Sequence, residues 1–166
     1  MRKMTEENLK SAFAGESQAY MRYLIFSEKA EEEGFKNVGK IFRAIAYAEQ
    51  VHATNHYNVL GMIRNTAENL QEAINGETFE VNEMYPAYNV IAKLQDERGA
   101  QRTTEWALQA EKIHAAIYQK ARQAVESGRD VQIDSIYVCS ICGYTSEEEI
   151  ERCPICGAPK EKIKKF

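Results

Sequence analysis

Apolar residues recur every three or four positions over most of this chain, which is the period of an amphipathic helix. Gly34 stands where the first such segment stops, a position at which helices often end in a left-handed residue. We expect Thr66 to cap the third segment, and Pro86 to kink it by removing the hydrogen bond to the carbonyl of Asn82. The pattern predicts four long helices, over about residues 5–33, 37–64, 66–95 and 100–126.

The helical period disappears near residue 129. The residues that follow favour strand: Val131, Ile133, Ile136, Tyr137 and Val138. This tail of about 30 residues is too small to hold a hydrophobic core, so a metal would have to organise it. We therefore predict two domains, residues 1–133 and 134–166.

Composition and charge limit the partners and the cellular location that we expect for the protein. A net charge of −4 gives no reason to expect nucleic acid or an anionic membrane as a partner. The N-terminus lacks the apolar segment of a signal peptide, and no stretch approaches the 18 apolar residues of a membrane span. All four cysteines lie after residue 138, which favours one metal site over a disulfide framework. We expect a soluble, cytoplasmic protein.

A short pattern occurs twice in the helical part. In each copy a Gly-Glu dipeptide leads to Glu-x-x-His 33 or 34 residues later. The candidate ligands are Glu16, Glu49, His52, Glu77, Glu111 and His114. Residues three apart share a helix face, and this combination from four helices is that of ferritin-like di-iron and di-manganese bundles. The repeat predicts a two-metal site bridged by carboxylates, with solvated surface glutamates as the alternative.

The two copies differ at one position. Glu80 lies three residues after Glu77, on the same face, whereas its counterpart in the first copy is Ala19. The predicted site is therefore asymmetric, with one extra carboxylate. His56 has no counterpart in the second copy, and we interpret it as a packed or surface histidine.

The cysteines form two Cys-x-x-Cys knuckles separated by ten residues. The four are Cys139, Cys142, Cys153 and Cys156. Four thiolates at this spacing predict a tetrahedral site for one zinc or one iron ion. A neighbouring two-metal bundle favours iron, because redox chemistry there needs an electron entry point.

Together these motifs resemble those of the rubrerythrin family, which are ferritin-like di-iron peroxidases fused to a rubredoxin-like domain. The resemblance covers nearly the whole chain and extends to residues 12–18 and 83–86. It implies an all-α four-helix ferritin-like bundle followed by a small C-terminal rubredoxin-like domain of strands and loops around a metal.

The resemblance also implies residue roles. Glu49 and Glu111 would bridge two irons, while His52 and Glu80 would alternate on one iron as it is reduced and oxidised. Tyr23 and Tyr85 would hydrogen-bond the site's carboxylates. The implied iron ligands are Glu16, Glu49, His52, Glu77, Glu80, Glu111 and His114, with one further iron, or zinc as prepared, on the four cysteines.

The function implied by the resemblance is reduction of hydrogen peroxide to water in oxidative-stress defence. Electrons would pass through the iron on the four cysteines from a redox partner such as a rubredoxin and its NAD(P)H reductase. The alternative is ferritin-like oxidation and sequestration of iron, with a structural zinc in the four-cysteine site.

The connection between the second and third helices is short for a single-chain bundle. These helices run parallel in such a bundle, so the chain must return along its length. His52 and Glu77 are 25 residues apart, and most of those residues are helical, whereas the return needs about ten extended residues. We expect a domain-swapped homodimer, in which helices one and two of one chain pack on helices three and four of another. The competing expectation is shortened helices, with Gly61 ending the second one early.

Overall fold

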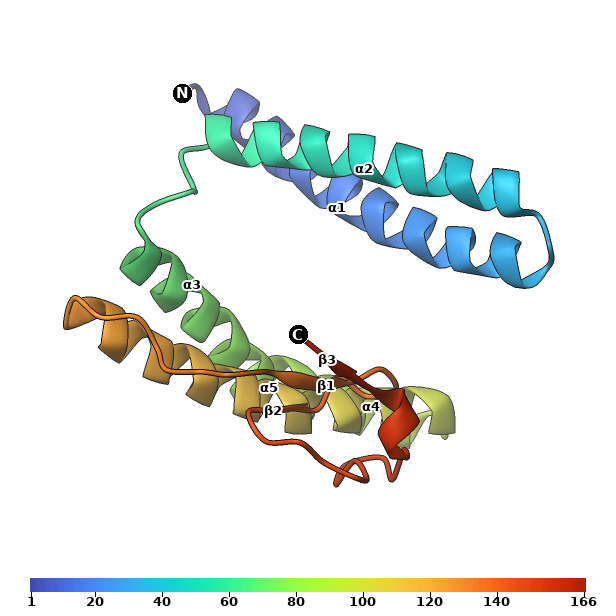
Figure 1. Ribbon diagram of the computed structural model, residues 1–166. Coiled ribbons are helices and arrows are strands. Elements are labelled where there is room, and N and C mark those ends of the chain that lie inside the picture. The colour runs from blue at the N-terminus through green and yellow to red at the C-terminus, as the bar shows by residue number, and fades with distance from the viewer. The chain divides into compact units, whose positions relative to one another are not determined.

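The computed structural model describes all 166 residues and divides into two compact units, Met1–Arg64 and Asn65–Phe166 (Figure 1). The first unit is a pair of helices, and the second contains further helices and a small sheet. The predicted fold class, a helical protein with a small C-terminal domain of strands and loops, is confirmed. None of the helices combines the length and apolar character needed to cross a bilayer.

The first unit is a hairpin of α1 (Lys3–Glu32) and α2 (Lys36–Val59), joined by a short turn (Figure 1). The prediction that α2 reaches residue 64 is wrong, because the helix ends at Val59. Gly61 has a φ of +68°, and the amides of Gly61 and Met62 bond back to carbonyls of the last helical turn. This left-handed cap confirms the expectation that Gly61 ends the helix early.

The two helices approach closely at Gly39 of α2. The Ser27 hydroxyl, buried on α1, donates a hydrogen bond of 2.8 Å to the Gly39 carbonyl oxygen. A Cβ atom at residue 39 would lie 2.7 Å from Cγ of Glu31 and 3.1 Å from the Ser27 carbonyl oxygen. Such contacts are too short for an ordinary side chain, so glycine is required here despite its poor helix propensity.

Gly39→Ala is accordingly expected to destabilise the protein by about 1 kcal/mol, because overpacking costs about 1–3 kcal/mol and the gain in helix propensity is at most about 1 kcal/mol. Urea unfolding of the metal-free protein measures the effect. Gly99→Ala is the matched control, since Gly99 is also helical but has open space where a Cβ would stand. Equal stabilisation by both substitutions would contradict the close approach at Gly39.

The second unit begins with α3 (Thr66–Phe79), a π-helical turn (Glu80–Met84) and α4 (Tyr85–Leu94), and α5 (Arg98–Glu126) packs against all three. The prediction of one helix over residues 66–95, kinked at Pro86, is wrong in its detail. The amide of Tyr85 bonds to the carbonyl of Glu80, five residues back. This widened turn places Pro86 in the first turn of α4, where a missing N–H is tolerated.

The cap of α3 also differs from the prediction. Asn65, not Thr66, is the N-cap residue, and its side-chain oxygen accepts a hydrogen bond of 3.0 Å from the Glu68 amide. Thr66 is already the first residue of the helix. Both residue types can cap a helix, so the sequence alone does not separate them.

The C-terminal part holds three short strands, β1 (Tyr137–Cys139), β2 (Thr145–Ser146) and β3 (Ile163–Lys165), in the antiparallel order β2-β1-β3. A 3-10 turn (Lys160–Lys162) precedes β3. The strand predicted from Val131 onward is wrong for Val131, Ile133 and Ile136, which lie outside any strand. The predicted domain boundary at residues 133 and 134 stays a prediction.

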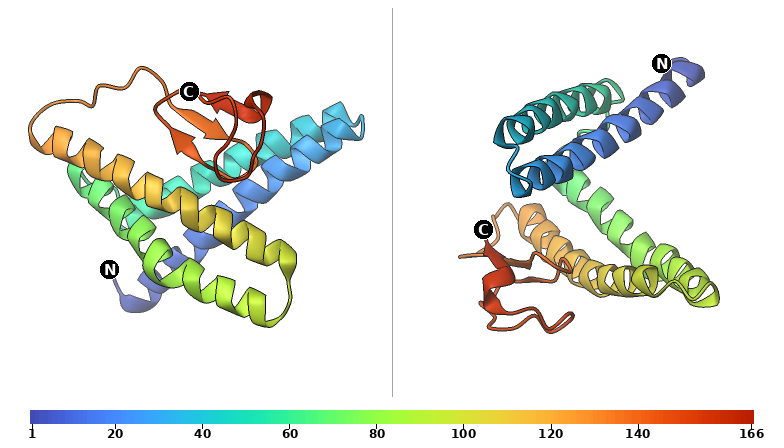
Figure 2. Two further views of the ribbon diagram at one scale, coloured as in Figure 1. Left: turned by 90° about the horizontal axis from the view of Figure 1, so that it is seen from below. Right: turned by 90° about the vertical axis from the view of Figure 1, so that its right-hand side faces the viewer.

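Cysteines form the interior of this small domain. Its buried apolar residues are Cys139, Cys153 and Ala158, with Tyr144, Ile155 and Ile163 packed around them. So little apolar surface cannot offset the entropy of ordering the chain, which agrees with the prediction that a metal organises it. The domain lies alongside α5 (Figure 2).

Candidate metal centres

The first group of candidate ligands lies between α1 and α2. Glu16 comes from α1, and Glu49 and His52 come from one face of α2. Their ligand atoms all lie within 4.8 Å of one another. Nδ1 of His52 is 3.1 Å from a carboxylate oxygen of Glu49 and 4.0 Å from one of Glu16. We call this set the first triad.

A second triad with the same composition lies in the other unit. Glu77 comes from α3, and Glu111 and His114 come from α5. Their ligand atoms also lie within 4.8 Å of one another, and Nδ1 of His114 is 2.5 Å from a carboxylate oxygen of Glu111. The sequence repeat therefore corresponds to a structural repeat, with one Glu, Glu, His set in each unit.

The carboxylates of the second triad repel one another when no cation is present. The pKa of Glu77 is raised to about 7, first by burial and then by the hydrogen bond and negative charge of Glu111. With this raised pKa, Glu77 holds a proton near neutral pH more readily than an ordinary carboxyl does. A divalent cation bound there would take the place of that proton.

Glu80 is the first residue of the π-helical turn and Tyr85 directly follows the turn, and neither belongs to the second triad. The pKa of Glu80 is raised by burial and by the charge of Glu111, while His114 opposes the shift. The pKa of the Tyr85 hydroxyl is raised by burial and then by the charges of Glu80 and Glu111. The negative charge of the triad therefore raises the pKa values of both side chains. π-Helical turns often occur at functional sites, and this one sets the position of Glu80.

Tyr23 lies in the first unit, in an aromatic cluster. Its ring centroid is 6.2 Å from that of Phe42 and 6.4 Å from that of Phe26. Hydrogen bonds from Tyr23 and Tyr85 to the carboxylates stay predictions. His56 is half-buried and belongs to neither triad, and its interpretation as a packed or surface histidine stays a prediction.

The four cysteines converge on one point. The Sγ atoms of Cys139 and Cys156 are 3.6 Å apart, and those of Cys142 and Cys153 are 3.4 Å apart. A tetrahedral ion with metal–sulfur bonds of about 2.3 Å would place the sulfurs about 3.8 Å apart, so these distances fit a single ion. All four thiols are free of disulfide bonds.

The two knuckles have the same backbone geometry. The amide of Gly143 bonds to the carbonyl of Cys139, and the amide of Gly157 bonds to that of Cys153, each at 2.9 Å. Both glycines have positive φ, +79° and +75°. In each knuckle the left-handed glycine closes the turn, so that the two cysteine sulfurs of that knuckle are directed to the same side.

Backbone amides activate one of the thiols. Burial opposes ionisation of Cys153, but hydrogen bonds from the amides of Cys156 and Ile155 outweigh it and lower its pKa to about 7. The pKa of Cys142, in contrast, is raised by burial. A metal ligand must be a thiolate, so Cys153 is the cysteine best prepared to begin binding.

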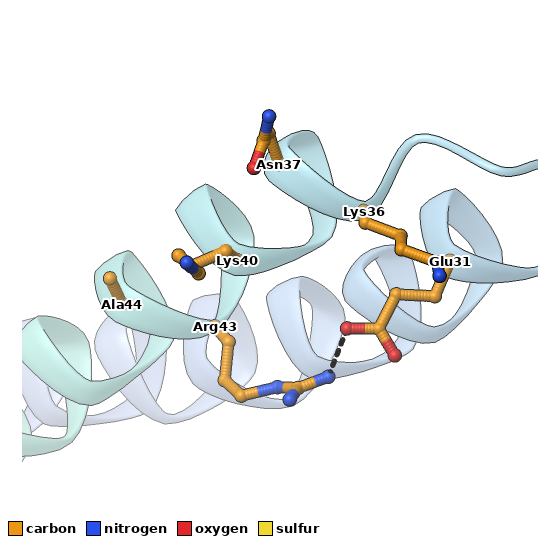
Figure 3. Close-up of a pocket in the computed structure, with 6 residues that line it drawn as sticks. All are labelled: Glu31, Lys36, Asn37, Lys40, Arg43 and Ala44. Carbon is orange, nitrogen blue, oxygen red and sulfur yellow. Dashed lines mark hydrogen bonds and ion pairs between the residues drawn. The ribbon is translucent and has the colours of Figure 1, made fainter.

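A surface pocket lies near the turn between α1 and α2 and is not a metal site (Figure 3). The ion pair of Arg43 with Glu31, at 2.5 Å, lies across it (Figure 3). It contains no histidine or cysteine, and Glu31 is about 20 Å along α1 from Glu16 at 1.5 Å per residue. The other lining residues are Lys36, Asn37, Lys40 and Ala44.

Sequence reasoning missed one residue of the second triad's surroundings. Nε2 of His114 lies 2.8 Å from the hydroxyl oxygen of Thr145, on β2 of the C-terminal domain. No spacing rule connects residues 31 positions apart on a helix and a strand, so the sequence gives no signal for this contact.

Comparisons with known proteins agree with both the Glu and His triads and the four-cysteine site. The sequence model of the rubrerythrin family matches residues 7–122, and that of the rubrerythrin rubredoxin-like domain matches residues 137–164. Rubrerythrin-2 from Clostridium acetobutylicum is 46% identical over 178 aligned residues, which cover 98% of this chain and 97% of that protein. Nigerythrin from Nitratidesulfovibrio vulgaris is 34% identical, with 95% of this chain and 84% of that protein covered.

The fold is similar to a solved structure of nigerythrin in a partially reduced state. The two chains share 31% identity with a TM-score of 0.57, over 98% of this chain and 86% of the other. The Glu and His groups and the four cysteines of this chain fit iron centres. With family models covering both the helical and the cysteine-rich parts, the chain belongs to the rubrerythrin family.

Proposed function

We propose that this protein reduces hydrogen peroxide to water at a di-iron site, with electrons delivered through an iron ion on the four cysteines. The observation that carries the proposal is that the cysteine-rich domain and the second triad contact each other, through Thr145 and His114. A redox-active domain in contact with a metal ligand provides a route for electrons. A redox partner such as a rubredoxin, with its NAD(P)H reductase, would supply them.

The residues have distinct roles in this proposal. Bound iron supplies the two electrons that, with two protons, convert one peroxide molecule into two water molecules. Glu49 and Glu111 would each hold both ions, while Glu16, Glu77 and His114 would each hold one. His52 and Glu80 would be alternative ligands of one ion. Burial, and then the charges of Glu80 and Glu111, raise the pKa of Tyr85, so its hydroxyl keeps its proton.

One iron pair needs both triads, and the short connection between α2 and α3 favours two chains as their source. In a single-chain bundle, Glu77 and His52 must stand at the same height along the bundle axis to bind one pair of ions. From that height α2 continues for about 10 Å, and α3 begins about 16 Å before it reaches Glu77. The chain would then have to return about 27 Å and move about 10 Å sideways. Three of the connecting residues, Leu60–Met62, are folded onto the end of α2, and Ile63–Asn65 span at most about 14 Å.

Apolar side chains left exposed in both units support the same arrangement. In the first unit they are Met21, Ile25, Phe26, Ile41 and Ile45, and in the second they are Phe79, Tyr88, Ile91 and Leu94. Several of these side chains recur at helical spacing, Met21 with Ile25, Ile41 with Ile45, and Tyr88 with Ile91, which favours a helix face that packs on another protein surface. We propose a domain-swapped homodimer, in which the first unit of one chain and the second unit of the other complete each di-iron site.

A mixed dimer tests the swap. Glu16→Ala impairs the first triad and Glu111→Ala the second, so each variant alone is expected to be inactive. If the units swap, a dimer of the two variants contains one site with both substitutions and one intact site, and activity returns. Without swapping, every site carries one substitution. The absence of any recovery after forced subunit exchange would exclude the swapped arrangement.

The competing function is oxidation and storage of iron. Stopped-flow mixing of the reduced protein with peroxide and with oxygen separates the two functions. We expect peroxide to oxidise the protein faster than oxygen does, and excess Fe(II) to give no mineral. Faster reaction with oxygen, together with mineral formation, would favour storage.

A further inference from the structure

The side chain of Thr145 connects the cysteine-rich domain to the helix that carries the second triad. Its hydroxyl oxygen lies 2.8 Å from Nε2 of His114 and 3.0 Å from the carbonyl oxygen of Gly143. Thr145 is buried, with 8% of its surface exposed. Lys120 of α5 and Glu147 form an ion pair of 2.5 Å a short way along the same helix. Figure 2 shows the C-terminal domain lying along α5.

The hydrogen bond from Thr145 to Gly143 favours one tautomer of His114. A carbonyl oxygen can only accept, so the single hydroxyl proton of Thr145 is donated to Gly143. The hydroxyl oxygen must then accept from His114, which places the ring proton on Nε2.

Nδ1 is left with a lone pair, and it faces the second triad. This nitrogen lies 2.5 Å from a carboxylate oxygen of Glu111. Two lone pairs so close repel each other unless a proton or a cation lies within reach of both. The arrangement is therefore that of two ligand atoms directed at one cation.

We propose that Thr145 is a positioning residue, whose hydroxyl fixes His114 in the tautomer and orientation in which Nδ1 binds iron. The inference rests on the proposed role of His114 as an iron ligand. Partners of the non-binding ring nitrogen orient metal-binding histidines and raise their basicity. Here the partner comes from the cysteine-rich domain, and Gly143 directly follows Cys142, so the ligand geometry of the bundle depends on docking of that domain.

The tautomer can be measured without any turnover. Full-length protein labelled with ¹⁵N-histidine and loaded with zinc, which is diamagnetic, is examined by NMR. We expect a slowly exchanging proton on Nε2 of His114, with a nuclear Overhauser effect to the Thr145 methyl group. A proton on Nδ1 in the wild-type protein would overturn the proposal.

Two substitutions test the hydroxyl itself. Thr145→Val keeps the shape but removes the acceptor, and it is expected to lose the protected Nε2 proton and to weaken Fe(II) binding, measured against a chelator, about 10-fold. Thr145→Ser keeps the hydroxyl and should restore both properties. Unchanged affinity and an unchanged Nε2 signal in Thr145→Val would refute the role.

The zinc content of the four-cysteine site serves as the check on folding. If Thr145→Val loses that zinc, the wild-type tautomer and the Thr145→Ser variant decide the question. None of these measurements follows peroxide, so failure of the proposed peroxidase function and failure of this inference remain distinguishable.

Discussion

Glu111→Gln is expected to remove iron from the bundle and to lower peroxide reduction by at least about 100-fold, the upper range for loss of a partner of a metal ligand. Glu111 contacts His114 at 2.5 Å, and after burial it is the main cause of the raised pKa of Glu77. A neutral amide keeps the size of the side chain but supplies no negative charge to offset the repulsion between two cations. Iron content should fall from three ions per chain to one, held by the cysteines.

The matched control is Glu105→Gln, one and a half turns earlier on α5. Glu105 is exposed, and its side chain accepts a hydrogen bond from Gln109. This variant should keep three irons per chain and the wild-type rate. A Glu111→Gln protein with full iron content would contradict the assignment of Glu111 as a ligand, whatever its rate.

The parts of both sites that the sequence predicts are those set by local geometry. Glu49 and His52, like Glu111 and His114, share a helix face because they are three residues apart. The cysteine knuckles follow from the turn closed by a glycine with positive φ. The early end of α2 at Gly61 is likewise a local effect, because the left-handed residue caps the helix whatever lies around it.

The features that the sequence does not predict depend on contacts between distant segments or on a choice among near-equal local structures. Pro86 allows either a kink or a π-helical turn, and the structure has the second, with Glu80 as its first residue. The contact of Thr145 with His114 joins a strand to a helix. Val131 and Ile133 have strand propensity but lack a partner strand, so propensity alone gives the wrong assignment.

Replacing the iron of the four-cysteine site by zinc, with iron kept in the bundle, is expected to stop NAD(P)H-linked turnover. Zinc has no redox chemistry, so the steady-state rate should fall at least about 100-fold. The exchange leaves every side chain in place, and the sulfur spacings of 3.4 and 3.6 Å fit either ion. Electron entry is thereby removed without a change in the fold.

The first turnover separates electron delivery from the chemistry of the bundle. After chemical reduction of the di-iron site, the zinc form should react with one equivalent of peroxide as fast as the iron form. A sample taken through the same exchange but reloaded with iron is the control, and its visible absorption reports the iron on the four cysteines. Sustained turnover of the zinc form at the control's rate would mean that electrons reach the carboxylate site directly, and the contact between Thr145 and His114 would then serve only to orient the ligand.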